Sequence, residues 1–361
     1  MKPKAGIETI HPYQGGKPIE EVQRELGLTD IIKLASNENP LGPSPLAMEA
    51  IQHAAAQVNL YPDGNAYYLK MALANHWNVA PENLILGNGS NEVLQIIGET
   101  YISPDDEVVY SESAFIVYML VAKIFGAKSV VTPMHNHDQD LDAMGDAITD
   151  RTKAVFIANP NNPTGTIVAK DQTDRFMERV PEDVLVVFDE AYYEYVNRPD
   201  YPQTLPYIHD GRNVIITRTF SKIYGLAGLR IGYGLAKPEI IETMNRVRQP
   251  FNCNSVAQAA ARAALEDIEH VQRSQEINAS GKTYLYDALD KMGVAYVETE
   301  GNFLLVHLGQ SGQETADALL QKGVIVRPVA GYGFPNSVRV TIGLPEETER
   351  FINALKEAVN R

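Results

Sequence analysis

The run V-L-V-V-F-D at residues 184–189 constrains the fold of this chain more than any other stretch. Its apolar side chains point to both faces of a strand, so both faces have to be covered, as they are in parallel sheets. Similar apolar runs lie at residues 155–158 and 214–216, and helical patterns separate them. Strands that alternate with helices in this way predict an α/β fold with a mostly parallel central sheet flanked by helices.

The length of the chain and a change in its pattern predict two domains. A chain of 361 residues, 44% of them hydrophobic, can bury more than one core. After residue 265 the strands and helices alternate differently, which predicts a smaller α+β unit. We therefore expect an N-terminal arm at residues 1–35 that packs on the small domain or on a partner, a large cofactor-binding domain at 36–265 and a small domain at 266–361.

Charge and cysteine content limit the classes of partner. With 31 Lys and Arg against 46 Asp and Glu, the net charge of −15 argues against binding to nucleic acid or to an anionic membrane. The single cysteine, Cys253, excludes an internal disulfide and fits a reducing compartment. No run approaches the roughly 18 apolar residues of a membrane span, and the first residues lack the apolar core of a signal peptide. We expect a cytoplasmic protein.

The stretch T-R-T-F-S-K-I-Y-G-L-A-G-L-R-I-G-Y-G at residues 217–234 holds the most unusual side chain, Lys222. A lysine among Phe220, Ile223 and Tyr224 is costly to bury without a partner. One interpretation is a lysine that extends from a loop into solvent. The other is an amine whose pKa is lowered by partial burial and a nearby cation, so that it forms an imine with an aldehyde.

Two further motifs follow predicted strands. G-N-G-S-N-E at residues 87–92 opens a helix, and its glycines and free N–H groups suit a phosphate, although an ordinary strand-to-helix turn has the same form. Asp189 ends its strand at the carboxyl edge, where open α/β sheets bind ligands. An aspartate there can also simply cap a turn or helix.

Together, five separated motifs resemble the fold-type I pyridoxal-phosphate enzymes, and over essentially the whole chain the class I and II aminotransferases. They are G-S-N at residues 89–91, N-N-P-T-G at 161–165, D-E-A-Y at 189–192, S-K at 221–222, and Arg230. The resemblance implies a pyridoxal 5'-phosphate cofactor and no metal. It also implies a ping-pong reaction, in which one substrate gives its amino group to the cofactor and 2-oxoglutarate then takes it.

The resemblance also implies residue roles. Lys222 would form the imine with the cofactor aldehyde and move the substrate α-proton, and Asp189 would pair with the pyridinium nitrogen. Tyr192 and Asn162 would hydrogen-bond the 3-oxygen of the ring. The phosphate would be held by Gly89, Ser90, Asn91, Thr219, Ser221 and Arg230.

Two aromatic residues have implied roles with plain alternatives. Phe115 falls where the family stacks an aromatic side chain on the cofactor ring, but its turn departs from the usual proline-containing form, and a core phenylalanine is the alternative. Tyr61 falls where family members reach the cofactor phosphate of the other subunit in a homodimer. The active sites would then be shared between two chains; the alternative is a surface tyrosine beside a turn.

The finer resemblance is to the histidinol-phosphate aminotransferases of histidine biosynthesis. It rests on H-P-Y, L-A-S-N-E-N-P-L-G-P-S-P, L-Y-P-D-G, P-F-N-C-N-S-V-A-Q-A-A, V-I-V-R-P and V-R-V-T-I-G. These enzymes must accept a phosphate ester with an imidazole and also a dicarboxylate. Arg339 would grip either anion in a forked manner, and Arg327, Tyr13 and Asn37 would assist. The alternative interpretation is that both arginines are strand residues whose side chains point outward.

Other functions stay open from the sequence. An arginine pair and an apolar pocket also suit an aminotransferase for phenylalanine or tyrosine. A pyridoxal-phosphate decarboxylase of the same fold, acting on a phosphorylated threonine, would share the cofactor residues. A transcription regulator with an aminotransferase-like domain would need an N-terminal DNA-binding module. This acidic chain begins too close to the fold to hold one.

Overall fold

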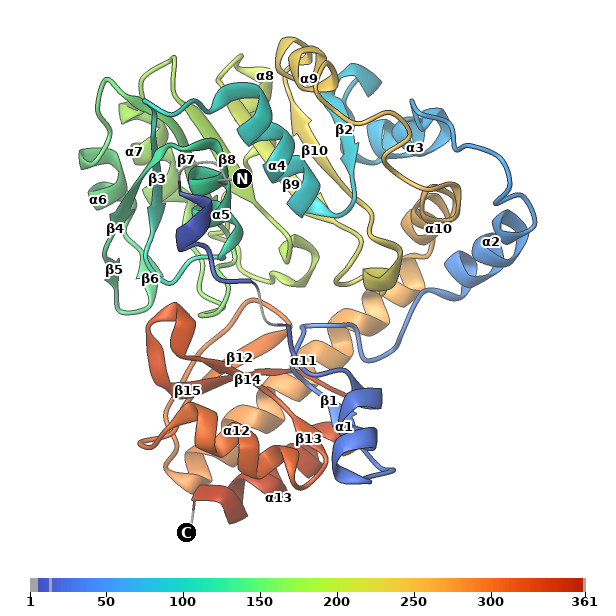
Figure 1. Cartoon of the computed structure of the whole chain (residues 1–361), viewed down its shortest axis with the longest axis vertical. Coiled ribbons are helices and arrows are strands. Elements are labelled where there is room, and N and C mark those ends of the chain that lie inside the picture. Colours follow the sequence, from blue (N-terminus) through green and yellow to red (C-terminus); the bar gives the residue numbers. More distant parts are fainter. Residues whose placement is uncertain (1–5, 13–14, 360–361) are drawn as a thin grey trace.

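The computed structural model describes residues 6–12 and 15–359, and it confirms the α/β class (Figure 1). Its centre is a seven-stranded sheet in which only one strand, β10, runs antiparallel to its neighbours. The strands, in spatial order, are β2 (Leu84–Gly87), β10 (Gly232–Ala236), β9 (Val214–Thr219), β8 (Leu185–Asp189), β7 (Thr152–Ala158), β3 (Glu107–Ser111) and β4 (Lys128–Thr132). The carboxyl ends of six strands and the start of β10 therefore meet at one edge.

Helices cover both faces of this sheet, as the unbroken apolar strands require. Side chains that alternate along β8 fall into two separate cores: Val186 and Phe188 in one, Leu185 and Val187 in the other. The first core is closed by α2 (Pro45–Ala55), α3 (Tyr67–Trp77), α6 (Leu141–Asp146), α7 (Lys170–Arg179), α8 (Leu205–His209) and α10 (Ser255–Glu266). The second is closed by α4 (Ser90–Tyr101), α5 (Val117–Phe125) and α9 (Pro238–Asn245).

A smaller, antiparallel sheet lies below the first in Figure 1 and is formed by strands between residues 296 and 341. Its strands, in spatial order, are β11 (Tyr296–Val297), β12 (Phe303–His307), β15 (Phe334–Thr341) and β14 (Arg327–Val329). The long helix α11 (Ile268–Met292) descends to it from the upper half, and α12 (Gly312–Leu320) and α13 (Pro345–Val359) complete its core.

The N-terminal segment packs against this lower unit. Helix α1 (Ile19–Leu26) buries Val22 beside Ile325, and β1 (Ile32–Lys33) pairs in parallel with β13 (Val324–Ile325). On this arrangement we propose the domain limits expected from the sequence, with an arm at residues 1–35 and domains at 36–265 and 266–361.

Side chains cap two of the helices, and short elements complete the described chain. Ser44 caps α2, with its Oγ accepting from the Ala47 N–H at 3.2 Å. Asn254 caps α10, with its side chain accepting from the Ala257 N–H at 2.8 Å. The remaining elements are η1 (Ile7–Thr9), η2 (Pro81–Asn83), β5 (Met134–His135), β6 (Asp138–Gln139), η3 (Tyr193–Tyr195), η4 (Ala227–Leu229) and η5 (Ala330–Tyr332).

Within the described residues, every helix is too short or too polar to cross a bilayer.

Candidate active site

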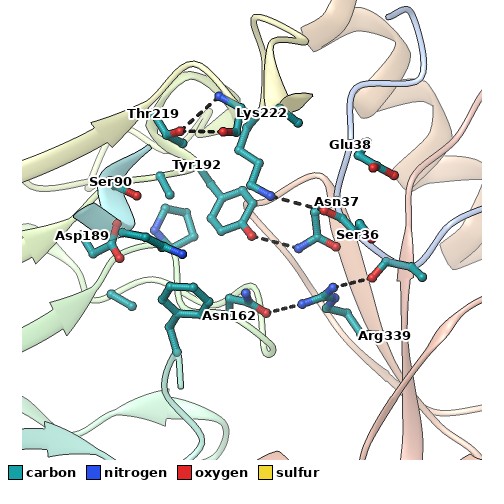
Figure 2. Close-up of a pocket in the computed structure, with 18 of the residues that line it drawn as sticks. Ser36, Asn37, Glu38, Ser90, Asn162, Asp189, Tyr192, Thr219, Lys222 and Arg339 are labelled. Carbon is teal, nitrogen blue, oxygen red and sulfur yellow. Dashed lines mark hydrogen bonds between the residues drawn. The ribbon is translucent and has the colours of Figure 1, made fainter. Parts of the chain in front are cut away.

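A cavity of about 270 Å³, open to solvent, lies where the carboxyl edge of the large sheet faces the small sheet (Figure 2). Strands deliver several of its charged and polar side chains. Asp189 is the last residue of β8, Thr219 is the last of β9, and Arg339 comes from β15. The predicted residues that line it are Asn37, Ser90, Asn91, Phe115, Asn162, Asp189, Tyr192, Thr219, Ser221, Lys222, Arg230 and Arg339.

One end of the cavity has the form of an anion cradle. Helix α4 begins there, and the first N–H groups of a helix have no partner within it. Gly89 precedes the helix with φ of 72°, and a Cβ on it would lie 2.5 Å from Arg230 Nη2, so only glycine fits. Arg230 Nη1 donates to Ser221 Oγ at 3.1 Å, and Thr219 Oγ1 donates to the same oxygen at 3.0 Å. Gly89 thus shapes the cradle from behind without lining the cavity.

Asp189 lies buried across the cavity from Arg339 (Figure 2). Burial raises the pKa of its carboxyl group from 3.8 to about 6, and two hydroxyl groups oppose that rise. Tyr118 Oη donates to one carboxylate oxygen at 3.0 Å, and Thr217 Oγ1 donates to the other at 3.1 Å. Both donors are missing from the residues predicted from the sequence.

The Lys222 side chain extends into the cavity, and its Nζ donates to the Ser36 carbonyl at 3.3 Å (Figure 2). Burial lowers the pKa of this amine from 10.5 to about 7, and the nearby Arg339 cation lowers it further, whereas Glu38 acts in the opposite direction. The low pKa that the sequence suggested for Lys222 therefore has a structural cause.

We expect the reactivity of Lys222 with aldehydes to depend on pH through this lowered pKa. The neutral amine is the nucleophile, and it predominates above the folded pKa of about 7 and is lost as pH falls below it. Imine formation with an added aromatic aldehyde, followed by absorbance, should rise through that pH and level off above about 8. A profile still rising through pH 9 to 10 would show an ordinary lysine.

Residues predicted for the cofactor are bonded to residues predicted for the substrate. Asn37 Nδ2 donates to Tyr192 Oη at 2.9 Å, and Arg339 Nη1 donates to Asn162 Oδ1 at 2.6 Å. Arg339 Nη2 also donates to the Ala35 carbonyl at 2.7 Å, which holds the guanidinium in a buried position. Burial raises the pKa of Tyr192 to about 12, against the effect of Arg339, so its hydroxyl group stays protonated. These two hydrogen bonds join the residues predicted for the cofactor to those predicted for the substrate.

Tyr61 and Arg327, both predicted for the site, do not line the cavity, and Gly89 lies behind it. Tyr61 is 85% exposed and stacks on Phe251 with ring centroids 5.0 Å apart. Arg327 is opposite Arg339 in the register of β14 and β15 but lines an adjoining cavity with Lys17. Tyr13 lies outside the described residues. Its role and those of Tyr61 and Arg327 stay predictions.

Several lining residues were not predicted from the sequence. Tyr118 has a signal that was available, because it is three residues after Phe115 and so comes from the same side of the chain. Ser36 and Glu38 flank the predicted Asn37, and Tyr332 reaches the cavity from η5. Glu38 also accepts from Lys33 Nζ at 2.8 Å.

Comparison with known proteins gives one consistent answer. Residues 29–355 match the family model described as aminotransferase class I and II. A histidinol-phosphate aminotransferase of Moorella thermoacetica is 55% identical over 357 residues, which cover 99% of this chain and 92% of the relative. Histidinol-phosphate aminotransferase 1 of Nitrosococcus oceani is 50% identical over 98% of this chain and 95% of its own length.

A solved structure gives the same answer for the three-dimensional fold. The histidinol-phosphate aminotransferase of Sinorhizobium meliloti, crystallised in complex with pyridoxal-5'-phosphate, superposes with a TM-score of 0.91 and 28% identity. The match covers 99% of this chain and 97% of that one. With these matches and the cavity described above, the chain belongs to the class I and II aminotransferases, and within them to the histidinol-phosphate aminotransferase family.

Proposed function

We propose that this protein converts L-histidinol phosphate and 2-oxoglutarate to imidazole acetol phosphate and L-glutamate, a step of histidine biosynthesis, with pyridoxal 5'-phosphate as cofactor. The main observation behind this proposal is that Lys222, Arg339 and the anion cradle all line the same cavity. The names of the relatives support the same substrate.

The residues present fit this cofactor from end to end. The cradle of α4, Ser221 and Arg230 is shaped for a phosphate, because Gly89 leaves room for the Arg230 guanidinium beside the helix start. Asp189, Tyr192 and Asn162 line the same cavity; Asp189 would pair with a ring nitrogen, and Tyr192 and Asn162 would hydrogen-bond a ring oxygen. Phe115 lines the same space and offers a ring face for stacking.

The chemistry divides between the cofactor and the chain. Bound pyridoxal phosphate supplies an aldehyde that joins amines and a ring that accepts an electron pair from the substrate α-carbon. Lys222 Nζ, neutral above pH about 7, would take the proton from the substrate α-carbon and hold it for its return. Asp189 would pair with the ring nitrogen and so favour its protonated form, which keeps the ring electron-poor.

Arg339 gives the pocket its tolerance for two different anions. Its guanidinium is fixed by Asn162 and the Ala35 carbonyl, so its position does not have to be set by the ligand. A planar guanidinium bonds a phosphate monoester or a carboxylate with the same pair of N–H groups. The same residue therefore suits histidinol phosphate in one half-reaction and 2-oxoglutarate in the other.

Steady-state assays with a panel of amino donors test the substrate. We expect kcat/KM for L-histidinol phosphate to exceed that for phenylalanine or tyrosine by at least about tenfold, because only the phosphate ester supplies a doubly charged anion to Arg339. A reversed order would replace the proposal with an aromatic aminotransferase. Release of carbon dioxide from a phosphorylated threonine would replace it with a decarboxylase.

We also propose that two copies of this chain form a homodimer with shared active sites. Several aromatic side chains near Tyr61 are exposed, namely Tyr67, Tyr68 and Phe251, and an exposed aromatic cluster marks a contact surface. The Arg230 side of the cradle is likewise exposed in one chain. Sedimentation of the purified protein should give twice the mass of 39.9 kDa, and a monomer that transaminates at full rate would contradict this. A cytoplasmic location is proposed with it, supported by the reduced, buried Cys253.

A further inference from the structure

Tyr118 contacts Asp189 from a helix that none of the predicted roles involves. Its hydroxyl group donates to Asp189 Oδ2 at 3.0 Å, and its side chain is completely buried. Burial raises the pKa of Tyr118 well above its usual value of 10, so the phenol keeps its proton and is always the donor. The hydrogen bond therefore favours the ionised form of Asp189.

The ring of Tyr118 is held in place independently of this hydrogen bond. It stacks on Phe156 with centroids 5.0 Å apart and planes 13° apart, and it meets Phe115 edge to face at 6.0 Å. Phe115 lines the cavity beside the space assigned to the cofactor ring. Tyr118 thus links the residue proposed to stack on the ring with the residue proposed to pair with its nitrogen.

We propose that Tyr118 is a positioning residue that keeps Asp189 ionised and aimed at the ring nitrogen of the cofactor. The inference rests on the proposed function, because it assigns Tyr118 to the same site. Asp189 has two oxygens, and Thr217 donates to the other one at 3.1 Å. With both oxygens fixed by hydroxyl groups on neighbouring elements, the carboxylate cannot rotate without losing a bond.

Other groups around Asp189 also affect its charge, and their effects have to be distinguished from the effect of Tyr118. Those that face Asp189 or Tyr118 are Glu190 beside Asp189, Tyr192, Lys222 from the loop after β9, and Tyr332 from η5. The pKa of Lys222, at about 7, falls near that of Asp189, at about 6, so the two groups titrate over the same range. A suitable probe therefore must not react with Lys222.

Pyridoxamine phosphate is such a probe, because it has the ring and phosphate of the cofactor but no aldehyde. Its dissociation constant with the apoprotein can be measured by calorimetry between pH 5.5 and 8.5. We expect Tyr118→Phe to weaken binding about tenfold near pH 6.5 and less at pH 8.5, because a lost hydrogen bond to a charged group raises the pKa of Asp189 further. The variant-to-wild-type ratio at each pH cancels the titration that both proteins share.

Tyr110→Phe is the matched control. Tyr110 is a buried tyrosine of the same aromatic cluster, with its ring centroid 6.4 Å from that of Tyr118, and its hydroxyl group does not bond Asp189. We expect its binding profile to follow that of wild type. Tyr118→His, which keeps a ring with an N–H donor, should recover part of the lost affinity.

Each outcome decides the matter. Equal binding profiles for Tyr118→Phe and Tyr110→Phe would overturn the role of Tyr118 while leaving the proposed function intact. Loss of folding in Tyr118→Phe alone would also overturn it, because the hydroxyl group would then be a requirement of the core. A wild-type protein that does not bind pyridoxamine phosphate would instead refute the proposed function itself.

Discussion

Replacing Lys222 with alanine is expected to lower the rate of transamination by at least about 10⁴-fold. The variant lacks both the amine that attaches the cofactor and the base that moves the α-proton, and each such group alone contributes orders of magnitude. The fold should survive, because within the described part of the chain the Lys222 amine donates only to the Ser36 carbonyl, at 3.3 Å, and its removal relieves a buried amine. Single-turnover absorbance with L-histidinol phosphate measures the loss.

Two observations separate this from general damage. Lys237→Ala removes a lysine that lies outside the cavity, where Nζ donates to the Gly211 carbonyl, and it should keep wild-type rates. Lys222→Ala should also still bind pyridoxamine phosphate, since that ligand needs no imine. If Lys222→Ala retained more than about a hundredth of the wild-type rate, another group would have to be the base.

Replacing Arg339 with alanine is expected to lower kcat/KM by about 10²- to 10³-fold for both L-histidinol phosphate and 2-oxoglutarate. The buried guanidinium is the cation that the structure fixes beside Lys222, through Asn162 at 2.6 Å and the Ala35 carbonyl at 2.7 Å. Arg339→Lys should recover little, because an ammonium group lacks the paired donors that grip an anion. Losing the cation also removes one cause of the low pKa of Lys222, so the pH profile should shift upward.

Arg327→Ala is the matched control, since Arg327 lies opposite Arg339 on the neighbouring strand but lines the adjoining cavity. We expect kcat/KM to change less than about tenfold. A loss as severe as that of Arg339→Ala for both substrates would show that Arg327 reaches the ligand, as the sequence predicted. An effect of Arg339→Ala on only one substrate would contradict a shared anion site.

The residues predicted correctly for the cavity follow the ends of strands. An apolar run such as 184–189 predicts a buried strand, and the polar residue that ends it must then lie at the sheet edge. Asp189 and Lys222 were found in this way, whereas the resemblance to the family supplied Thr219 and the roles of all three. Local sequence suffices for such residues because the strand order hardly changes which edge they reach.

Contacts between segments that are far apart in the chain could not be predicted from the sequence. Tyr192 meets Asn37 across 155 positions, and Asn162 meets Arg339 across 177. Whether a residue on β14 or β15 faces the cavity depends on how the small sheet packs against the large one. In the observed packing Arg339 lines the cavity, and Arg327 lines the adjoining one. Tyr118 was missed for a similar reason, since its partner Asp189 lies on another element.

The most direct test of the central claim is an absorbance spectrum of the purified protein with pyridoxal phosphate, followed while L-histidinol phosphate and then 2-oxoglutarate are added. We expect the band of the Lys222 imine to give way to that of the aminated cofactor, and 2-oxoglutarate to restore it. A spectrum that responds to phenylalanine or tyrosine but not to L-histidinol phosphate would contradict the proposed substrate. No imine band at pH 8, where Lys222 is neutral, would contradict the role of Lys222 itself.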